Sequence, residues 1–197
     1  MSTGTRLPAA VRREQLLDVT KEIAVRRGFH AVSIDAVARA AGVSRPIVYD
    51  HFRDLPGLLE ALVEREAERA REQLEAVMPT EIAPGDARGA LLDAQRRYLE
   101  AAQSDPDTWR LVLMPPEGAP ESMREQIAAG RAEAVATLAE ALRPVLGERP
   151  DVLDPELLAR MLSTMADEAV RLVLTDPERY PAERVLAGTR WMLERLV

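Results

Sequence analysis

The 197-residue chain has no cysteine, two histidines and few aromatic residues, which make up 4% of the sequence. Without cysteine, disulfide bonds and thiolate metal sites are excluded. Because 47% of the residues are apolar but so few are aromatic, we expect a core of leucine, valine and alanine. Such a core favours helices over sheets.

Long apolar stretches are also missing. The sequence has no run of about 18 apolar residues, and residues 1–10 lack the hydrophobic region of a signal peptide. We therefore expect a soluble, cytoplasmic protein without a membrane partner. A chain of this length can bury a sizeable core, as one domain or as a small domain followed by a larger one.

Residue groupings that support catalysis are lacking as well. The two histidines, His30 and His51, are too far apart in sequence to bind a metal from one helix face. Neither a Gly-x-Ser-x-Gly motif nor a phosphate-binding loop is present. We therefore expect no enzymatic activity, no catalytic residue, no metal and no cofactor.

Charge is distributed unevenly along the chain. Residues 1–55 contain nine cations and six anions, a net charge of +3, whereas the whole chain carries −7. The remaining residues therefore carry −10. A basic end on an acidic chain is typical of a protein with one DNA-facing end, although chance asymmetry explains the same numbers.

Residues 33–59 contain the most informative pattern. Four apolar residues of its first part recur at the spacing of one helix face: Ile34, Val37, Ala38 and Ala41. Gly42 can end that helix in the left-handed conformation, and Ser44 can cap a second helix with Pro46 in its first turn. Two short helices joined by a glycine-containing turn are typical of a helix-turn-helix, whose second helix enters the DNA major groove.

Seven residues in and beside this pattern are candidate DNA contacts. Arg45 can pair with O6 and N7 of guanine, and Pro46 can contact a thymine methyl group. The other five carry donors that suit phosphate: Ser33, Ser44, Tyr49, His51 and Arg53. Outside a helix-turn-helix, Tyr49 would be interpreted as a core residue, and Arg53 as a solvated loop residue.

This stretch resembles the N-terminal signature of the TetR family of bacterial transcription regulators. The resemblance covers about the first 60 residues and is carried by Gly28, Ser33, Ile34, Val37, Ala38, Ala41, Gly42, Val43, Ser44, Pro46, Val48, Tyr49, His51, Phe52, Leu58 and Leu59. The chain departs from the signature at Leu55, where the family usually has lysine. Arg53 is the nearest cation that could replace it.

The rest of the sequence predicts seven further helices, one before the helix-turn-helix and six after it, and no strand. Aspartates are expected to cap four of them: Asp54, Asp86, Asp105 and Asp154. The charged second half of the helix after Asp54 should be mostly solvated. We expect an all-α fold of about nine helices, with a DNA-binding domain in residues 1–55 and a helical ligand-binding and dimerisation domain in residues 56–197.

The resemblance implies a homodimeric repressor that binds a double-stranded operator, an inverted repeat, and is released by an unknown small-molecule effector. The helix predicted at residues 154–175 is apolar on two faces, so it should be central or covered by a second subunit together with residues 181–196. An activator or a regulator controlled by a protein partner remains an alternative. A small α-helical enzyme with an accidental helix-turn-helix is a further alternative.

Six residues of the helical body are candidates for effector binding because their side chains are polarizable and adaptable: Tyr98, Trp109, Met114, Met123, Met161 and Met165. Ordinary core packing is the simpler explanation for any one of them taken singly. Trp109 is the strongest candidate, because it precedes a Pro-Pro loop that could form the mouth of a pocket. Asp167 and Glu168 could be buried, but we expect both to face solvent at a helix edge.

Overall fold

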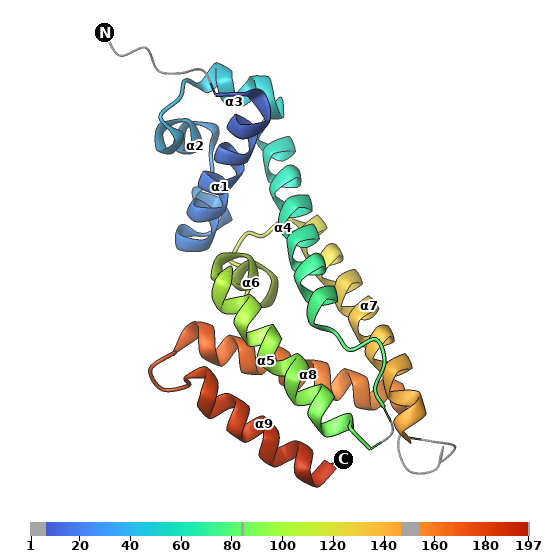
Figure 1. Ribbon diagram of the computed structural model, residues 1–197. Coiled ribbons are helices and arrows are strands. Elements are labelled where there is room, and N and C mark those ends of the chain that lie inside the picture. Colours follow the sequence, from blue (N-terminus) through green and yellow to red (C-terminus); the bar gives the residue numbers. More distant parts are fainter. Residues whose placement is uncertain (1–6, 84, 147–153, 197) are drawn as a thin grey trace. The chain divides into compact units, whose positions relative to one another are not determined.

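The computed structural model describes residues 7–83, 85–146 and 154–196 (Figure 1). Within these ranges the protein has nine α-helices, one short 3₁₀ helix and no strand, which confirms the all-α prediction. The chain forms two compact units, residues 1–66 with 115–125 and residues 67–114 with 126–197. No helix in the described ranges is long and apolar enough to cross a membrane.

The first unit contains the predicted helix-turn-helix. Its helices are α1 (Ala9–Arg27), the 3₁₀ turn Phe29–Ala31, α2 (Ile34–Ala41), α3 (Arg45–Phe52) and the first part of α4 (Leu55–Val77). The core of this unit is formed mainly by Leu16, Leu17, Val37, Val48, Phe52, Leu58 and Leu62. These residues come from all four α-helices, so burial of their side chains holds α2 and α3 in place.

The turn between α2 and α3 forms as its sequence predicts, with one exception. Gly42 has φ 67°, and the N–H of Val43 donates to the Ala38 carbonyl at 2.9 Å. Ser33 caps α2 by accepting from the Ala36 N–H at 3.1 Å. The prediction that the Ser44 side chain caps α3 is wrong, because only its backbone carbonyl accepts at this end, from Ile47 at 3.0 Å.

A cluster of charged side chains joins α1 to α4. Glu66 is fully buried and pairs with Lys21 at 3.1 Å and with Arg65 at 2.7 Å. Arg65 also pairs with Glu14 at 3.0 Å and with Asp18 at 2.9 Å. The prediction of a mostly solvated face in this half of α4 is therefore wrong for Glu66, because α1 supplies the cation that lets a carboxylate be buried.

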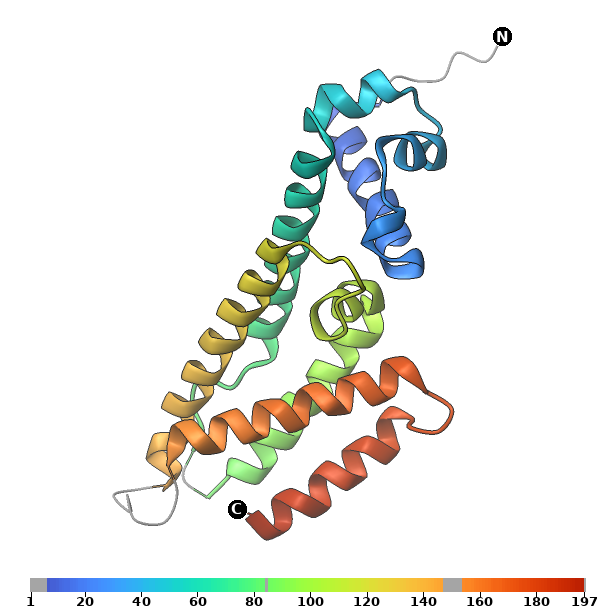
Figure 2. The same cartoon turned by 180° about the vertical axis from the view of Figure 1, so that it is seen from behind.

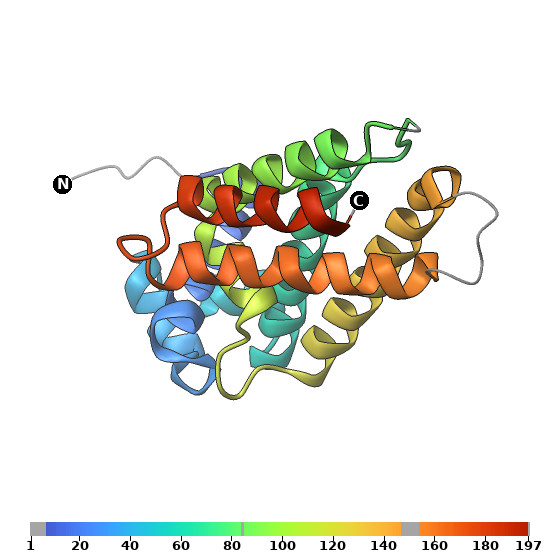
Figure 3. The same ribbon diagram turned by 90° about the horizontal axis from the view of Figure 1, so that it is seen from below.

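The second unit is a bundle built from the rest of α4, α5 (Ala87–Ser104), α6 (Pro106–Leu113), most of α7 (Glu121–Leu146), α8 (Pro155–Thr175) and α9 (Ala182–Leu196). Helices α8 and α9 run side by side in opposite directions, and α5 packs against both (Figure 2 and Figure 3). Apolar side chains of these helices form the core, among them Leu99, Leu142, Leu158, Val170 and Leu193.

Three of the four predicted aspartate caps are confirmed. Asp54 accepts from the Gly57 N–H at 2.8 Å, Asp105 accepts from the Thr108 N–H and hydroxyl, and Asp154 accepts from the Glu156 N–H at 2.8 Å. Asp86 occupies the N-cap position of α5, but its side chain makes no capping hydrogen bond, so this prediction is wrong.

The prediction of two apolar faces on α8 is confirmed in part. One of these faces is predicted to contain Leu157, Met161, Val170 and Val173. Val170 and Val173 are buried in the bundle, whereas Leu157 and Met161 are 53% and 57% exposed. On the neighbouring α9, Trp191 is 58% exposed. The second unit therefore presents large apolar side chains to solvent on two adjacent helices.

Candidate DNA-binding surface and ligand cavity

Helix α3 buries one face and exposes the other. Val48 and Phe52 are buried against the core of the first unit, while Arg45, Pro46 and Tyr49 are exposed. Arg45 and Tyr49 are four residues apart, so their side chains lie on the same face of the helix. This exposed face can enter a DNA groove without disturbing the core.

The side chain of Arg45 is held by a carboxylate of the preceding helix. Its Nε and Nη2 atoms pair with the two carboxylate oxygens of Asp35 in the first turn of α2. A guanidinium has five N–H donors, so this pairing leaves three for another partner. Sequence analysis did not identify Asp35, because only the turn between α2 and α3 brings residues ten positions apart together.

Arg53 lies in a strained turn between α3 and α4. It is the only non-glycine residue with positive φ in the described part of the chain, at φ 65° and ψ −50°. The N–H of Asp54 donates to the Phe52 carbonyl at 2.6 Å, which closes a γ-turn around Arg53. A Cβ on Gly57 would lie 2.6 Å from the Phe52 carbonyl oxygen, so only glycine fits against this turn.

The other candidate DNA contacts occupy more varied positions. Ser44 is exposed, whereas Ser33 and His51 are half-buried and the Ser33 oxygen already caps α2. Leu55, where the family signature usually has lysine, is a half-buried first residue of α4. The structure therefore brings Arg45, Pro46 and Tyr49 together on one exposed helix face.

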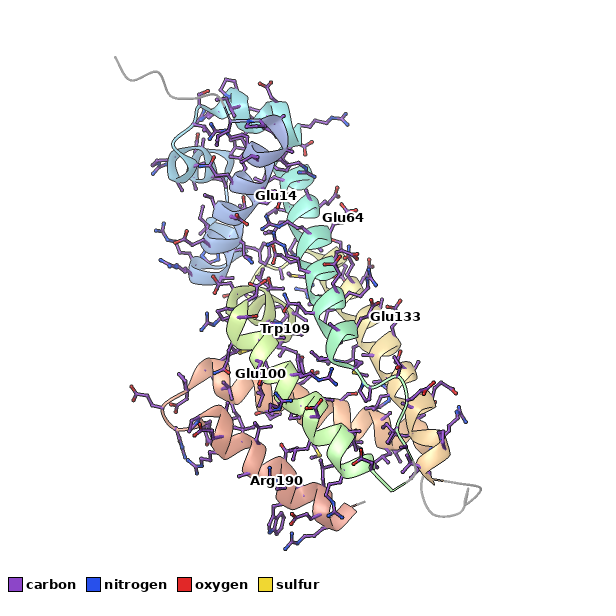
Figure 4. All side chains as sticks on the ribbon, viewed as in Figure 1. Glu14, Glu64, Glu100, Trp109, Glu133 and Arg190 are labelled. Atoms are coloured by element: carbon purple, nitrogen blue, oxygen red, sulfur yellow. The ribbon has the colours of Figure 1, made fainter. Side chains whose placement is uncertain are left out.

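The second unit contains a cavity of about 510 Å³, within the range of about 300–1,000 Å³ typical of small-molecule sites. Residues of α4, α5, α6, α7, α8 and α9 line it, and most of the lining is apolar. Trp109 of α6, labelled in Figure 4, is a fully buried part of the wall. Its indole N–H donates to Gln73 Oε1 at 2.8 Å, and its ring contacts the Tyr98 ring edge-to-face at 4.8 Å.

Polar side chains form one part of the cavity wall. The Tyr98 hydroxyl donates to Asp167 Oδ1 at 3.1 Å, and Arg131 pairs with Asp167 Oδ2 at 2.6 Å. Burial raises the pKa of the Asp167 carboxyl above its ordinary value of 3.8, and Arg131 and the Tyr98 hydroxyl oppose that rise. Burial, together with the adjacent Asp167 charge, also raises the pKa of Tyr98 well above 10.0, so Tyr98 stays a hydrogen-bond donor at neutral pH.

The structure separates the six residues predicted to bind an effector. Tyr98, Trp109 and Met165 line the cavity. Met114 packs against the core without lining the cavity, and Met161 is exposed. Met123 is buried, but it belongs to the first unit, whereas every lining residue belongs to the second. Helical periodicity cannot distinguish a cavity wall from ordinary core, which is why the prediction mixed the three environments.

The structure also tests the predictions for Asp167 and Glu168. The expectation that Asp167 faces solvent is wrong, because its side chain is only 15% exposed and lines the cavity, whereas Glu168 is exposed as expected. Sequence analysis also missed Gln95, a buried residue of the wall one turn before Tyr98 on α5. Its position on the apolar face of an amphipathic helix was the available signal.

The first unit thus has the architecture of a helix-turn-helix DNA-binding domain. Residues 16–62 match the sequence model of the bacterial regulatory proteins of the tetR family. This match covers the helix-turn-helix and the helices beside it, and the whole fold is similar to that of TetR-like structures.

Individual relatives resemble the chain to different extents. The transcriptional activator FasR of Mycolicibacterium smegmatis is 33% identical over 110 residues, which cover 56% of this chain and 49% of FasR. The chain therefore spans about half the length of this curated relative.

Two solved structures share the whole fold. A TetR-like regulator from Rhodococcus sp. RHA1 has a TM-score of 0.75 at 24% identity, covering 96% of this chain and 97% of that one. The structure of AibR in complex with isovaleryl coenzyme A and operator DNA has a TM-score of 0.70 at 21% identity, covering 92% and 97%. At these identities the similarity establishes the fold.

Proposed function

We propose that the protein is a sequence-specific transcriptional regulator that binds a double-stranded operator as a homodimer and represses until a small-molecule effector releases it. The exposed face of α3 carries this proposal, because it presents Arg45, Pro46 and Tyr49 outward from a helix-turn-helix with a packed core. Arg45 reads guanine, and Tyr49 contacts phosphate together with Ser33, Ser44, His51 and Arg53. We assign DNA binding to residues 1–55, and ligand binding and dimerisation to residues 56–197.

The exposed apolar residues of α8 and α9 support dimerisation. Leu157, Met161 and Trp191 are large, and each is more than half exposed. A two-fold interface would cover the same apolar patch on both subunits. Such a homodimer would present two copies of α3, which suits an operator with an inverted repeat.

The cavity of the second unit supports a small-molecule effector. AibR was solved with both isovaleryl coenzyme A and operator DNA, so a protein of this fold can hold a ligand. In this chain, Ala70 and Leu74 of α4 line the cavity, and the same helix supplies Leu58 and Leu62 to the core of the first unit. An effector releases DNA only if it binds the released state more tightly, and we propose that α4 transmits this difference.

Activation is the second candidate function, because the relative FasR is named an activator. Both functions use the same DNA-binding surface and differ in where the operator lies relative to the promoter. We further propose that the protein acts in the cytoplasm, without enzymatic activity and without a metal or cofactor. A reporter gene placed behind the protein's own upstream region distinguishes repression from activation. Deletion of the regulator raises reporter expression if the protein represses and lowers it if the protein activates.

A gel-shift experiment tests the proposal directly. The purified protein should shift the upstream region of its own gene and should sediment as a dimer at micromolar concentration. Failure to shift that DNA or any inverted repeat selected from a random pool, or a folded monomer in sedimentation, would contradict it.

A substitution in the cavity tests the effector arm of the proposal. Gly130 of α7 lines the cavity, and a Cβ added there meets no atom within 4 Å. Gly130→Leu should fill the cavity and abolish the response to effector while operator binding persists. Gly130→Ala is the matched control, since it adds helix propensity without filling the space. An unchanged effector response in Gly130→Leu would place the effector elsewhere.

A further inference from the structure

We propose that the cavity binds an amphiphilic amine, a molecule whose protonated amino group donates to the carboxylate of Asp167 while its apolar body occupies the rest of the space. Alkylamines and arylalkylamines belong to this class. The inference rests on the proposed role of the cavity as an effector site. It adds the chemical class of the effector and the side chain that recognises it.

Asp167 differs from the other charged residues that line the cavity. Those four residues are Arg71, Glu75, Arg131 and Glu133, and all of them are exposed. The side chain of Asp167, on α8, is only 15% exposed. An exposed side chain can turn its charge to water, whereas a largely buried carboxylate depends on the groups around it. A ligand enclosed in the cavity therefore meets a negative charge.

The protein compensates this carboxylate only in part. Asp167 Oδ1 accepts from the Tyr98 hydroxyl at 3.1 Å and Oδ2 accepts from Arg131 at 2.6 Å, which uses two of the about four acceptor positions of a carboxylate. Burial nevertheless raises the pKa of Asp167 above its ordinary value, although Arg131, Tyr98 and Arg171 oppose the rise. An ammonium group would supply both further donors and the missing positive charge.

The uncharged polar groups of the wall also favour a ligand that donates hydrogen bonds. Among the buried lining residues, Tyr98 already donates to Asp167 and the Trp109 indole N–H already donates to Gln73. The Nε2 atom of Gln95 has less than 1 Å² of accessible surface, so the amide atom left to meet a ligand is the acceptor Oε1. The buried part of the wall therefore offers acceptors, which suit the N–H donors of an amine.

An anionic ligand is disfavoured by the same wall. Its two arginines are already paired, Arg71 with Glu68 and Glu75, and Arg131 with Asp167. A ligand carboxylate would have to displace one of these ion pairs, in a wall whose three acidic and two basic residues carry a net charge of −1. A neutral alcohol could use the free acceptors, but it would leave the charge of the buried carboxylate uncompensated.

Three straight-chain probes test the proposal: octylammonium, 1-octanol and octanoate. They share an apolar chain and present a cation, a neutral donor and an anion. Isothermal titration calorimetry measures their binding to the full chain without DNA. Wild-type protein should bind octylammonium most tightly of the three. Tighter binding of 1-octanol or octanoate, or no binding of octylammonium, would overturn the proposal.

Variants of α8 then connect the preference to Asp167. Asp167→Asn keeps the shape of the side chain but removes its charge, so octylammonium binding should weaken by about 10- to 150-fold, the range of a hydrogen bond to a charged group. Binding of 1-octanol should change far less. Glu168→Gln is the matched control, because it removes a charge from the adjacent exposed residue outside the cavity. Equal losses of octylammonium binding in the two variants would overturn the assignment.

The pH dependence of binding provides a second measurement. An alkylammonium, like a lysine side chain with a pKa of about 10.4, stays protonated between pH 7 and pH 4, as do the arginines and Tyr98 that face Asp167. Wild-type protein should therefore lose affinity for octylammonium on acidification, as Asp167 takes up a proton. The exposed glutamates of the wall also titrate, but Asp167→Asn retains them and should lose less. An equal loss in both proteins would contradict the role of Asp167.

The outcome can be separated from that of the proposed function. If Asp167→Asn does not fold, the preference of the wild type among the three probes still decides the ligand class. A protein that shifts its operator but binds octanoate most tightly keeps its proposed function and loses this inference. A protein that binds octylammonium through Asp167 but no DNA keeps this inference as a ligand-binding property and loses the regulatory function.

Discussion

The two units treat their buried polar groups differently. In the first unit the fully buried Glu66 is neutralised by Lys21 and Arg65. In the second unit Gln95 keeps an unpaired donor, and burial raises the pKa of Asp167 despite its pairing with Arg131. In the first unit two cations compensate the buried Glu66 charge and so hold α1 against α4, whereas in the second unit Arg131 only partly offsets the burial of Asp167.

The exposed surfaces of the two units differ in a corresponding way. The first unit exposes the cations Arg45 and Arg53 at and beside α3. The second exposes the apolar residues Leu157, Met161 and Trp191 on α8 and α9. Cations suit phosphate and guanine, and an exposed apolar patch suits another protein surface. The contrast therefore predicts which substitutions affect stability, DNA binding or pH dependence.

The largest effect is expected from breaking the ion cluster of the first unit. Glu66→Gln would leave the cations of Lys21 and Arg65 without their buried partner, which should lower the free energy of unfolding by about 3–5 kcal/mol. Denaturation by urea, followed by circular dichroism, measures the loss. The exposed Glu64, labelled in Figure 4, provides the matched control, and Glu64→Gln should change stability by less than about 0.5 kcal/mol. Similar effects of the two substitutions would show that the cluster contributes little.

The next effect concerns specificity at the DNA-binding surface. Arg45→Ala should weaken operator binding by about 1–3 kcal/mol and binding to random DNA by less, because a guanine contact is lost. Tyr49→Phe is the contrasting variant, since loss of a phosphate contact should weaken both duplexes nearly equally. Fluorescence anisotropy with the two duplexes measures the difference. If Arg45→Ala weakens both duplexes equally, Arg45 does not read bases.

Asp35 extends the same comparison to the carboxylate that pairs with Arg45. Asp35→Ala would release the Arg45 guanidinium and restore its rotational freedom, so the preference for operator over random DNA should decrease. The loss should be smaller than for Arg45→Ala, because the guanidinium is still present. An increase in operator affinity would instead show that Asp35 competes with DNA for Arg45.

A smaller effect is expected at the strained turn. Arg53→Ala should flatten the plot of log affinity against log salt by about one unit, the share of one phosphate contact. Arg53→Gly should flatten it equally and also stabilise the fold, because glycine accepts the positive φ of this position. Unchanged slopes in both variants would show that Arg53 is a solvated loop residue.

The smallest effect is a pH dependence in the second unit. Because the pKa of Asp167 is raised above 3.8, the folded state holds its proton more tightly than the unfolded state does. Its ionised form therefore costs stability at neutral pH, and this cost disappears as the pH falls through the raised pKa. The melting temperature of the wild type relative to Asp167→Asn should rise between pH 7 and pH 4, and Glu168→Gln should show no such trend. A relative melting temperature that falls on acidification would contradict the raised pKa.

The helix-turn-helix, the all-α fold and three of the four aspartate caps could be predicted from the sequence. They depend on interactions over a few residues: Gly42 ends α2, Ser33 caps it, and prolines mark helix starts. Two cap predictions failed, because the residue type at an N-cap position does not by itself decide whether the side chain accepts a hydrogen bond. Ser44 and Asp86 occupy N-cap positions, but their side chains make no capping hydrogen bond.

The pairing of polar groups was decided by the tertiary structure alone. Asp35 meets Arg45 across a turn, Glu66 meets Lys21 from another helix, and Asp167 meets Tyr98 from a helix 69 positions away in sequence. No local pattern carries these contacts, since a carboxylate on a helix has the same sequence signature whether or not a distant helix supplies its partner. The sequence by itself determined the helices and their order. Only packing between helices decided which charges are buried together and where a cavity remains, because burial and pairing depend on neighbours that the local chain does not specify.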